Sequence, residues 1–132
     1  MALAYAALVR MDLLPAPSPG NRSQVVLLFA VLALILYPAT LGLTQFDPYR
    51  LGYHPRPLLL VTGALALILL LARNWLGVWM LGLATLAFAL GGKLSGNYWD
   101  YLLDPFLALS CWLATLWEGG RLAWRRIRTV TD

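Results

Sequence analysis

An uncharged and mostly apolar stretch, residues 25–43, limits what the chain can fold into. It has 19 residues, most of them Leu, Ala, Val and Ile. A helix needs about 20 such residues to cross a hydrocarbon core of about 30 Å. The stretch therefore predicts a first membrane-spanning helix, with Pro38 near its outer end as a place where the helix can kink.

The composition of the whole chain supports a membrane environment. Hydrophobic residues make up 61% of the 132 residues and charged residues only 12%, about half the charged share of an ordinary soluble domain. A chain this short exposes much of its surface even when it is compact, so water is a poor solvent for it. We expect a single membrane domain, with no room for a separate catalytic module outside the bilayer.

Three further apolar stretches predict spans at residues 58–72, 75–92 and 105–124. The second stretch has 15 residues, about 23 Å of helix, so Arg56 and Arg73 would have to snorkel at its ends. Arg73 and Asn74 predict a tight reversal, and Asp104 followed by Pro105 predicts a capped helix start. The continuous apolar runs lack the alternation of barrel strands. We expect an all-α integral membrane protein, a four-transmembrane-helix bundle.

The segments around these spans complete the predicted organisation. Residues 1–23 are expected to form an interfacial segment and a flexible Pro-rich connector, with Ser23 as a helix cap. The membrane domain takes residues 24–124, and residues 125–132 form a basic cytoplasmic tail. Between the first two spans, Asp47-Pro48 predicts a turn, and the prolines at 55 and 57 are expected to prevent regular helix.

The distribution of basic residues predicts the orientation. With four crossings, seven basic residues fall on one side and three on the other, which places both termini in the cytoplasm. We therefore expect a multi-pass protein of the plasma membrane, which in a bacterium is the inner membrane. The larger group contains Arg10, Arg22, Arg73, Arg121, Arg125, Arg126 and Arg128, and the smaller group contains Arg50, Arg56 and Lys93.

The two outer connections carry the polar residues from which a binding site could be built. Charged groups beside aromatic rings are suited to a sugar, a lipid head group or a partner's loop. The alternative is an interfacial aromatic belt with solvated charges, which we weigh ahead of a site, and Asp104 is expected to act mainly as a cap. The candidate binding residues are Asp47, Arg50, His54, Arg56, Lys93, Trp99, Asp100 and Asp104.

No motif in the sequence indicates catalysis. The chain lacks the nucleophile and phosphate-binding motifs, and His54 is its one histidine. The single cysteine, Cys111, excludes an intrachain disulfide, and His54 with distant carboxylates lacks the spacing of metal ligands. We expect no catalytic residue, no metal and no cofactor, and no binding to nucleic acid, because the basic residues flank apolar segments.

Small residues spaced four apart are typical of closely packed membrane helices. They indicate contacts within one chain or between chains. We expect a non-catalytic homo-oligomer or an accessory subunit, whose partners are membrane lipid and itself or another membrane protein. The alternative is a small oligomeric transporter or a lipid- or glycolipid-handling protein, with the outer Asp, His and Arg residues as its entry site. The spaced pairs are Thr62 with Ala66, Ala87 with Gly91, and Ser110 with Ala114.

Overall fold

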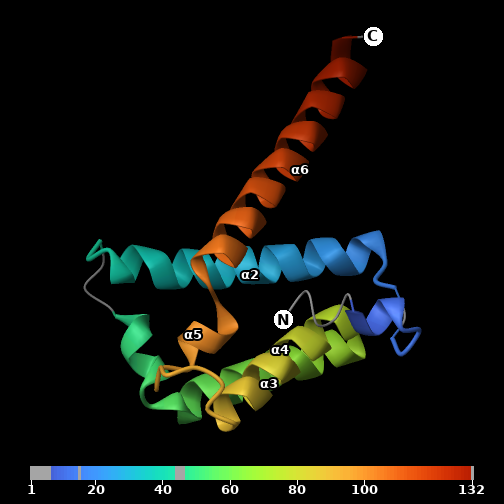
Figure 1. Cartoon of the computed structure of the whole chain (residues 1–132). Coiled ribbons are helices and arrows are strands. Elements are labelled where there is room, and N and C mark those ends of the chain that lie inside the picture. The colour runs from blue at the N-terminus through green and yellow to red at the C-terminus, as the bar shows by residue number, and fades with distance from the viewer. Residues whose placement is uncertain (1–6, 15, 44–46, 132) are drawn as a thin grey trace.

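The computed structural model describes residues 7–14, 16–43 and 47–131, with side chains described up to residue 128. Every regular element in these ranges is a helix (Figure 1). A helical turn at residues 7–10 comes first. The elements after it are α2 (Pro19–Thr40), the 3-10 helix η1 (Pro48–Gly52), α3 (Pro55–Leu71), α4 (Trp75–Ala89), α5 (Trp99–Leu102) and α6 (Pro105–Thr131).

Helix α2 begins earlier than the sequence predicted. Its cap is Ser18, whose side chain accepts a hydrogen bond from the backbone N–H of Asn21 at 3.1 Å, and Pro19 occupies the first turn. Ser23 is therefore not the cap, and the end of the predicted connector is helical. The prediction failed because Pro19 was interpreted as a helix breaker, whereas proline is favoured at the first helical position.

Helix α3 also begins within a segment that we expected to be irregular. It starts at Pro55, so both Pro55 and Pro57 lie in its first turn. The backbone N–H groups of a first turn have no partner within the helix, so proline removes nothing there. The predicted helix start at Asp104 is confirmed, because Asp104 caps α6 through the backbone N–H of Leu107 at 2.8 Å. The turn predicted at Asp47 and Pro48 is the start of the 3-10 helix η1, which Asp47 caps.

The reversal between α3 and α4 is confirmed and is built around a buried asparagine. Arg73 has a φ of 55°, and the Asn74 side-chain oxygen accepts a hydrogen bond from Gly77 N–H at 3.2 Å. The Asn74 amide nitrogen donates to the carbonyl of Asn21 and to the side chain of Gln24, both at 3.0 Å. We call these contacts the hairpin junction, because they join the α3–α4 hairpin to the start of α2.

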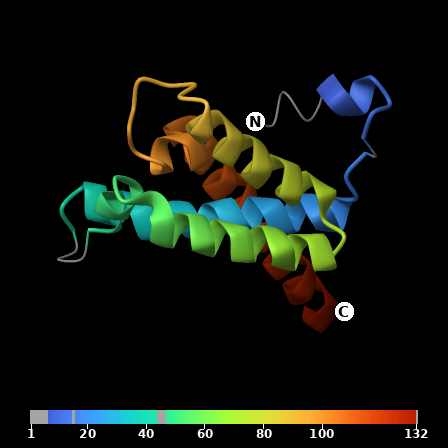
Figure 2. The same cartoon turned by 90° about the horizontal axis from the view of Figure 1, so that it is seen from below.

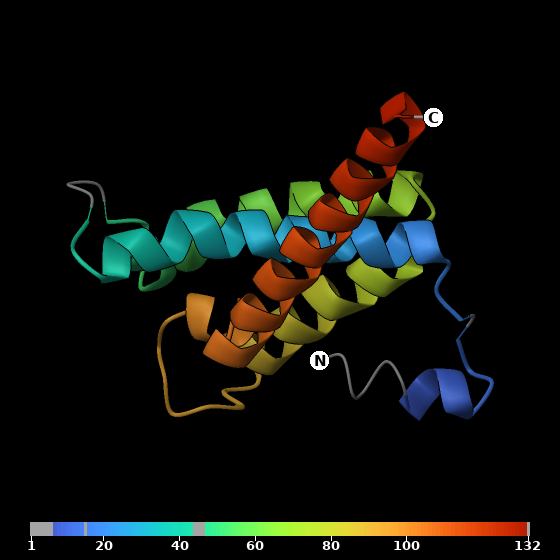
Figure 3. The same ribbon diagram turned by 90° about the horizontal axis from the view of Figure 1, so that it is seen from above.

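Helices α2, α3 and α4 run antiparallel in succession, while α6 takes a different direction. The α3–α4 pair lies on one side of α2 (Figures 1 and 2). Helix α6 lies on the other side, crosses α2 obliquely and extends away from the rest of the chain (Figures 1 and 3). The four long helices are thus not all side by side, and the four-span bundle stays a prediction.

The crossing of α6 over α2 is held by specific contacts. The indole N–H of Trp112 donates to the backbone carbonyl of Ala30 at 3.0 Å, and the Trp112 ring packs edge-on against Tyr37. Nearer the start of α2, the Ser23 hydroxyl donates to the Glu118 carboxylate at 3.3 Å. These contacts join the first half of α6 to α2.

The core lies between α2, the α3–α4 hairpin, α5 and the first half of α6. Two small core residues, Ala33 of α2 and Ala84 of α4, are almost completely buried. Their short side chains let the helix backbones lie close together. Gly77 contributes as well, since a Cβ atom there would lie 2.6 Å from the Leu69 side chain. The other core side chains include Val25, Phe29, Leu36, Leu81, Ala108 and Cys111.

The predicted pairs of small residues behave differently from one another. Thr62 is buried and its hydroxyl donates to the carbonyl of Leu58 in the same helix, while Ala66, Ala87 and Ala114 are half-buried. Gly91 has a φ of +65° after the end of α4, and a Cβ atom there would meet nothing within 4 Å. Ser110 is exposed. Packing within one chain thus does not use Gly91 or Ser110, and their contact between chains stays a prediction.

One described helix, α2, is long and apolar enough to cross a membrane, and it lies near the N-terminus. Helices α3 and α4 are apolar but shorter, with 17 and 15 residues. Many large apolar side chains of the outer surface are exposed, among them Leu34, Leu60, Leu71, Leu90 and Trp117. A surface of this kind requires a covering of lipid or protein.

Candidate functional site

The connections before α3 and after α4 meet at one end of the helices. The backbone N–H of Tyr98 donates to the carbonyl of Gly52 at 3.0 Å. The indole N–H of Trp99 donates to the carbonyl of Pro48 at 2.8 Å. We call the contact between residues 47–53 and 93–101 the loop junction, and it contains several of the predicted binding residues.

Asn97 lies at the centre of the loop junction and is completely buried. Its amide nitrogen donates to the carbonyl of Tyr49 at 3.0 Å, and its amide oxygen accepts from the backbone N–H of Trp99 at 3.0 Å. A buried amide without such partners would destabilise the fold. Asn97 therefore holds the two connections together and supplies hydrogen-bond partners to a backbone carbonyl of the first and a backbone N–H of the second.

Gly52 is required by this arrangement. A Cβ atom at residue 52 would lie 1.7 Å from the Asn97 side-chain oxygen and 2.9 Å from Cδ1 of Trp99. No real Cβ atom tolerates the first distance, and the obstacle is a fixed, hydrogen-bonded amide. The backbone of η1 can thus approach Asn97 only because residue 52 has no side chain.

Asp100 is the charged group of the loop junction, and its carboxylate already has partners. The Tyr49 hydroxyl donates to both carboxylate oxygens, at 3.1 and 3.3 Å, and the Ser95 hydroxyl donates to Oδ2. Lys93 donates from its ammonium group to the backbone carbonyl of Asp100. Burial and the hydrogen bond to Asp100 raise the pKa of Tyr49 to about 12, because both favour the neutral phenol.

The aromatic residues of the second connection are buried and do not face lipid. Tyr98, Trp99 and Tyr101 are each 5% exposed or less. The Tyr101 hydroxyl accepts from the backbone N–H of Lys93 at 2.9 Å and lies 2.8 Å from the Lys93 carbonyl. Phe88 packs against both tyrosine rings. The interpretation of these three residues as an interfacial belt is therefore wrong, because α5 folds inward and uses them as core.

A cavity of about 510 Å³ opens beside the loop junction. It brings together two of the predicted site residues, Asp47 and Asp100, with the hydroxyl groups of Thr40, Tyr37 and Tyr49. Carboxylates and hydroxyls suit a ligand that donates hydrogen bonds, such as a sugar or an ammonium group. The Asp47 carboxylate, however, accepts a hydrogen bond from the backbone N–H of Tyr49 at 3.0 Å and caps η1. Both carboxylates are therefore already hydrogen-bonded within the fold.

The other predicted site residues do not line this cavity. Arg50, His54 and Arg56 are exposed. His54 precedes α3 without a side-chain capping bond, and Asp104 is occupied as the cap of α6. Among the residues that the structure describes, no group of three His, Cys, Asp or Glu side chains is arranged to hold a metal ion.

Several residues of the loop junction were not predicted as site residues, among them Tyr49, Gly52, Ser95 and Asn97. Asn97 was visible as one polar residue of the second connection, but nothing in the sequence indicated that it is buried. Its contacts with Tyr49 and Gly52 join positions more than forty residues apart. A single sequence carries no signal for such a contact.

Comparison with known proteins gives no relative: no protein family, no curated protein and no solved structure matches this chain.

Proposed function

We propose that this chain is a non-catalytic membrane protein that crosses the bilayer four times with both termini in the cytoplasm. We further propose that it functions as a homo-oligomer, in which α6 packs against α6 of a second copy. The membrane placement is supported by the apolar α2, by the shorter apolar helices α3 and α4, and by the excess of arginine near both termini.

The observation that carries self-association is the exposed apolar surface of α6. The helix has 27 residues and is about 40 Å long. From residue 116 to residue 128 every side chain is exposed. An apolar stripe nonetheless continues along its whole length at intervals of three, four or seven residues, through Phe106, Leu113, Trp117, Trp124 and Ile127.

The small residues on this stripe favour a helix as its partner. Ser110 and Gly120 lie at the stripe positions between the larger side chains, and both are exposed. Small residues let two helix backbones approach closely, which lipid does not require. The stripes of two copies of α6 can also pack against each other about a twofold axis, which is the commonest symmetry of homo-oligomers.

The loop junction supports a non-catalytic function. The Asp100 carboxylate is bonded by Tyr49 and Ser95, and Asp47 is bonded to the η1 backbone. A transporter entry site built from outer Asp, His and Arg side chains is less well supported, because His54 and the arginines lie outside the cavity.

Disulfide crosslinking of single cysteines tests self-association. In a Cys111→Ser background, Leu113→Cys places a thiol on the α6 stripe, and we expect it to form a covalent dimer in native membranes. Leu60→Cys is the matched control, because Leu60 is an exposed apolar residue of α3. A crosslink to a different protein would identify an accessory subunit. Equal dimer yields from both variants, or none from either, would contradict the proposal.

The membrane placement has its own test. A label on the C-terminus should react with a membrane-impermeant reagent only after the cells are opened. Labelling of intact cells would overturn the topology, and a folded monomer in plain buffer would overturn the membrane assignment itself.

A further inference from the structure

A second cavity, of about 480 Å³, lies at the end of the helices opposite the loop junction. It is formed by residues 9, 10 and 17, by α2, by α4 and by the start of α6. Its volume falls within the range of about 300–1,000 Å³ that is typical of small-ligand sites. None of the predicted site residues takes part in it.

The walls of this cavity are apolar and belong to the core. Phe29 of α2, Met80 of α4 and Cys111 of α6 are each 5% exposed or less. An apolar cavity does not hold ordered water, because water finds no polar partners there. The walls therefore suit a hydrocarbon chain. The remaining apolar lining residues are Val9, Pro17, Val25, Val26, Leu76 and Leu107.

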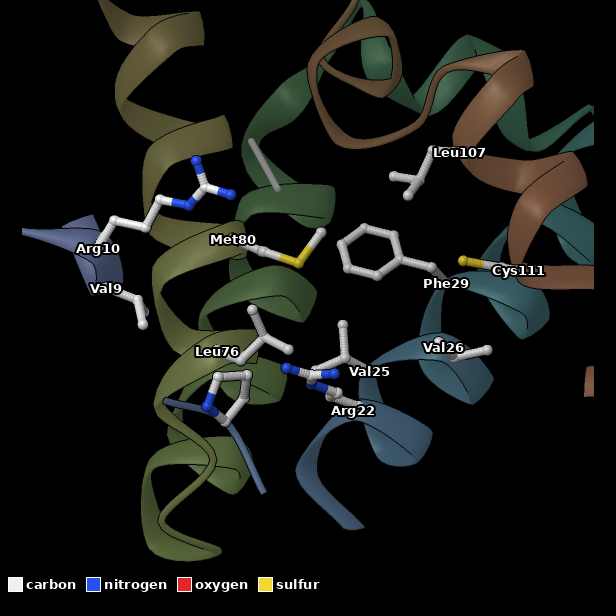
Figure 4. A pocket seen from close by; sticks show the side chains of 11 residues that line it. Val9, Arg10, Arg22, Val25, Val26, Phe29, Leu76, Met80, Leu107 and Cys111 are labelled. Atoms are coloured by element: carbon white, nitrogen blue, oxygen red, sulfur yellow. The ribbon is translucent and has the colours of Figure 1, made fainter. Parts of the chain in front are cut away.

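Two arginines are the charged residues that line the cavity. Arg10 comes from the helical turn at residues 7–10 and Arg22 from the start of α2, and both are exposed. Figure 4 shows Arg10 beside Met80 and Arg22 beside Val25, on either side of Leu76 and Met80, with Leu107 and Cys111 farther from Arg10. Among the described residues neither arginine side chain is in an ion pair. The cavity thus has a cationic mouth and an apolar interior.

We propose that this cavity binds an anionic phospholipid of the cytoplasmic leaflet, with one acyl chain inside and its phosphate between Arg10 and Arg22. The inference rests on the membrane placement proposed above but not on self-association. Guanidinium groups bind phosphate oxygens through paired hydrogen bonds, and two of them from separate segments can hold one phosphate. From Arg22 to Phe29 the cavity follows α2 for about 10 Å inward from the predicted cytoplasmic end.

Lipid retention by the purified full-length chain tests this proposal. The protein in mild detergent is mixed with phosphatidylglycerol or with phosphatidylcholine of the same acyl chains, and native mass spectrometry counts the bound lipid. We expect phosphatidylglycerol to be retained about thirtyfold more strongly, because no choline cation balances the charge of its phosphate and two basic residues face it. Arg10→Gln with Arg22→Gln should remove the preference, whereas Arg121→Gln with Arg125→Gln, an equal change of charge on α6, should keep it.

Cys111 supplies a second readout inside the cavity. It is the one cysteine of the chain and is buried. Phosphatidylglycerol should slow its reaction with a maleimide in the wild type and not in the Arg10→Gln, Arg22→Gln variant. Equal lipid-free reaction rates in the two proteins would show that the variant is folded.

Three outcomes would overturn the proposal: equal retention of the two lipids, equal loss of preference in the α6 control, or a free fatty acid bound in place of phospholipid. A membrane-bound protein with any of these results would leave the membrane placement standing.

Discussion

Two completely buried asparagines, Asn74 in the hairpin junction and Asn97 in the loop junction, each join segments that are distant in the chain, but they do so differently. Asn74 uses its oxygen to cap its own helix, and its nitrogen meets a carbonyl and the side chain of Gln24. Asn97 is wedged against the backbone of Gly52. In the hairpin junction, the Gln24 side chain can move when its neighbours change. In the loop junction, Asn97 lies against the Gly52 backbone, which cannot move in this way.

The largest expected effect comes from Gly52→Ala. The added methyl group would overlap the Asn97 oxygen, so the loop junction must open, and we expect a loss of about 3 kcal/mol in the free energy of unfolding. Unfolding in mixed detergent micelles, followed by tryptophan fluorescence, measures it. Gly63→Ala in α3 is the control, since its Cβ atom meets nothing within 4 Å, and it should be neutral or slightly stabilising.

Removal of the two asparagines tests the comparison directly. Asn97→Ala and Asn74→Ala should each cost about 1–3 kcal/mol, because each leaves buried backbone groups without partners. They should differ when combined with Gly52→Ala. Asn97→Ala removes the nearest obstacle to the methyl group of Gly52→Ala. The double variant should therefore lose less stability than the sum of the two single variants. For Asn74→Ala with Gly52→Ala, the two losses of stability should be additive. If the losses of stability are additive in both double variants, the Asn97 side chain is not the obstacle to a methyl group at residue 52.

A smaller effect is expected for Gly77→Ala, next to the hairpin junction. Its Cβ atom would lie 2.6 Å from Leu69 Cδ1 and 3.2 Å from Val25 Cγ2, both ends of side chains that can move. We expect a loss of about 1 kcal/mol in the same unfolding measurement. A loss as large as that of Gly52→Ala would indicate that both junctions are equally rigid.

The smallest effect concerns Tyr49 and pH. Its pKa is raised to about 12 from the ordinary value of about 10, so the folded state holds the phenol proton more tightly than the unfolded state. The stabilisation from this group is complete below about pH 10 and is lost as the pH rises toward 12. Difference absorption of the phenolate, wild type against Tyr49→Phe, should show one tyrosine ionising late.

Asp100→Asn supplies the control for that titration. Without the carboxylate, the Tyr49 pKa should fall toward its ordinary value, although burial would still hold part of the shift. An unchanged pKa would mean that the hydrogen bond to Asp100 does not form.

The sequence by itself determined the features that depend on neighbouring residues. The apolar run of α2, the turn at Asp47 and Pro48, the reversal at Arg73 and Asn74, and the cap at Asp104 were all predicted. Each of these depends on contacts within one helical turn or one short loop, which the order of the residues fixes directly. The helix starts at Pro19 and Pro55 are equally local, but they differ from the prediction, because proline interrupts the interior of a helix and yet is favoured in its first turn.

Only the tertiary structure decided the rest. The Gly52 and Asn97 contact, the burial of Trp99, the crossing of α6 over α2 and the cavity beneath Arg10 and Arg22 join segments that are distant in the chain. Such contacts depend on how preformed helices pack and on which loops can close between them. No single segment contains that information, since the same polar loop residues are compatible with a solvated rim and with a buried junction.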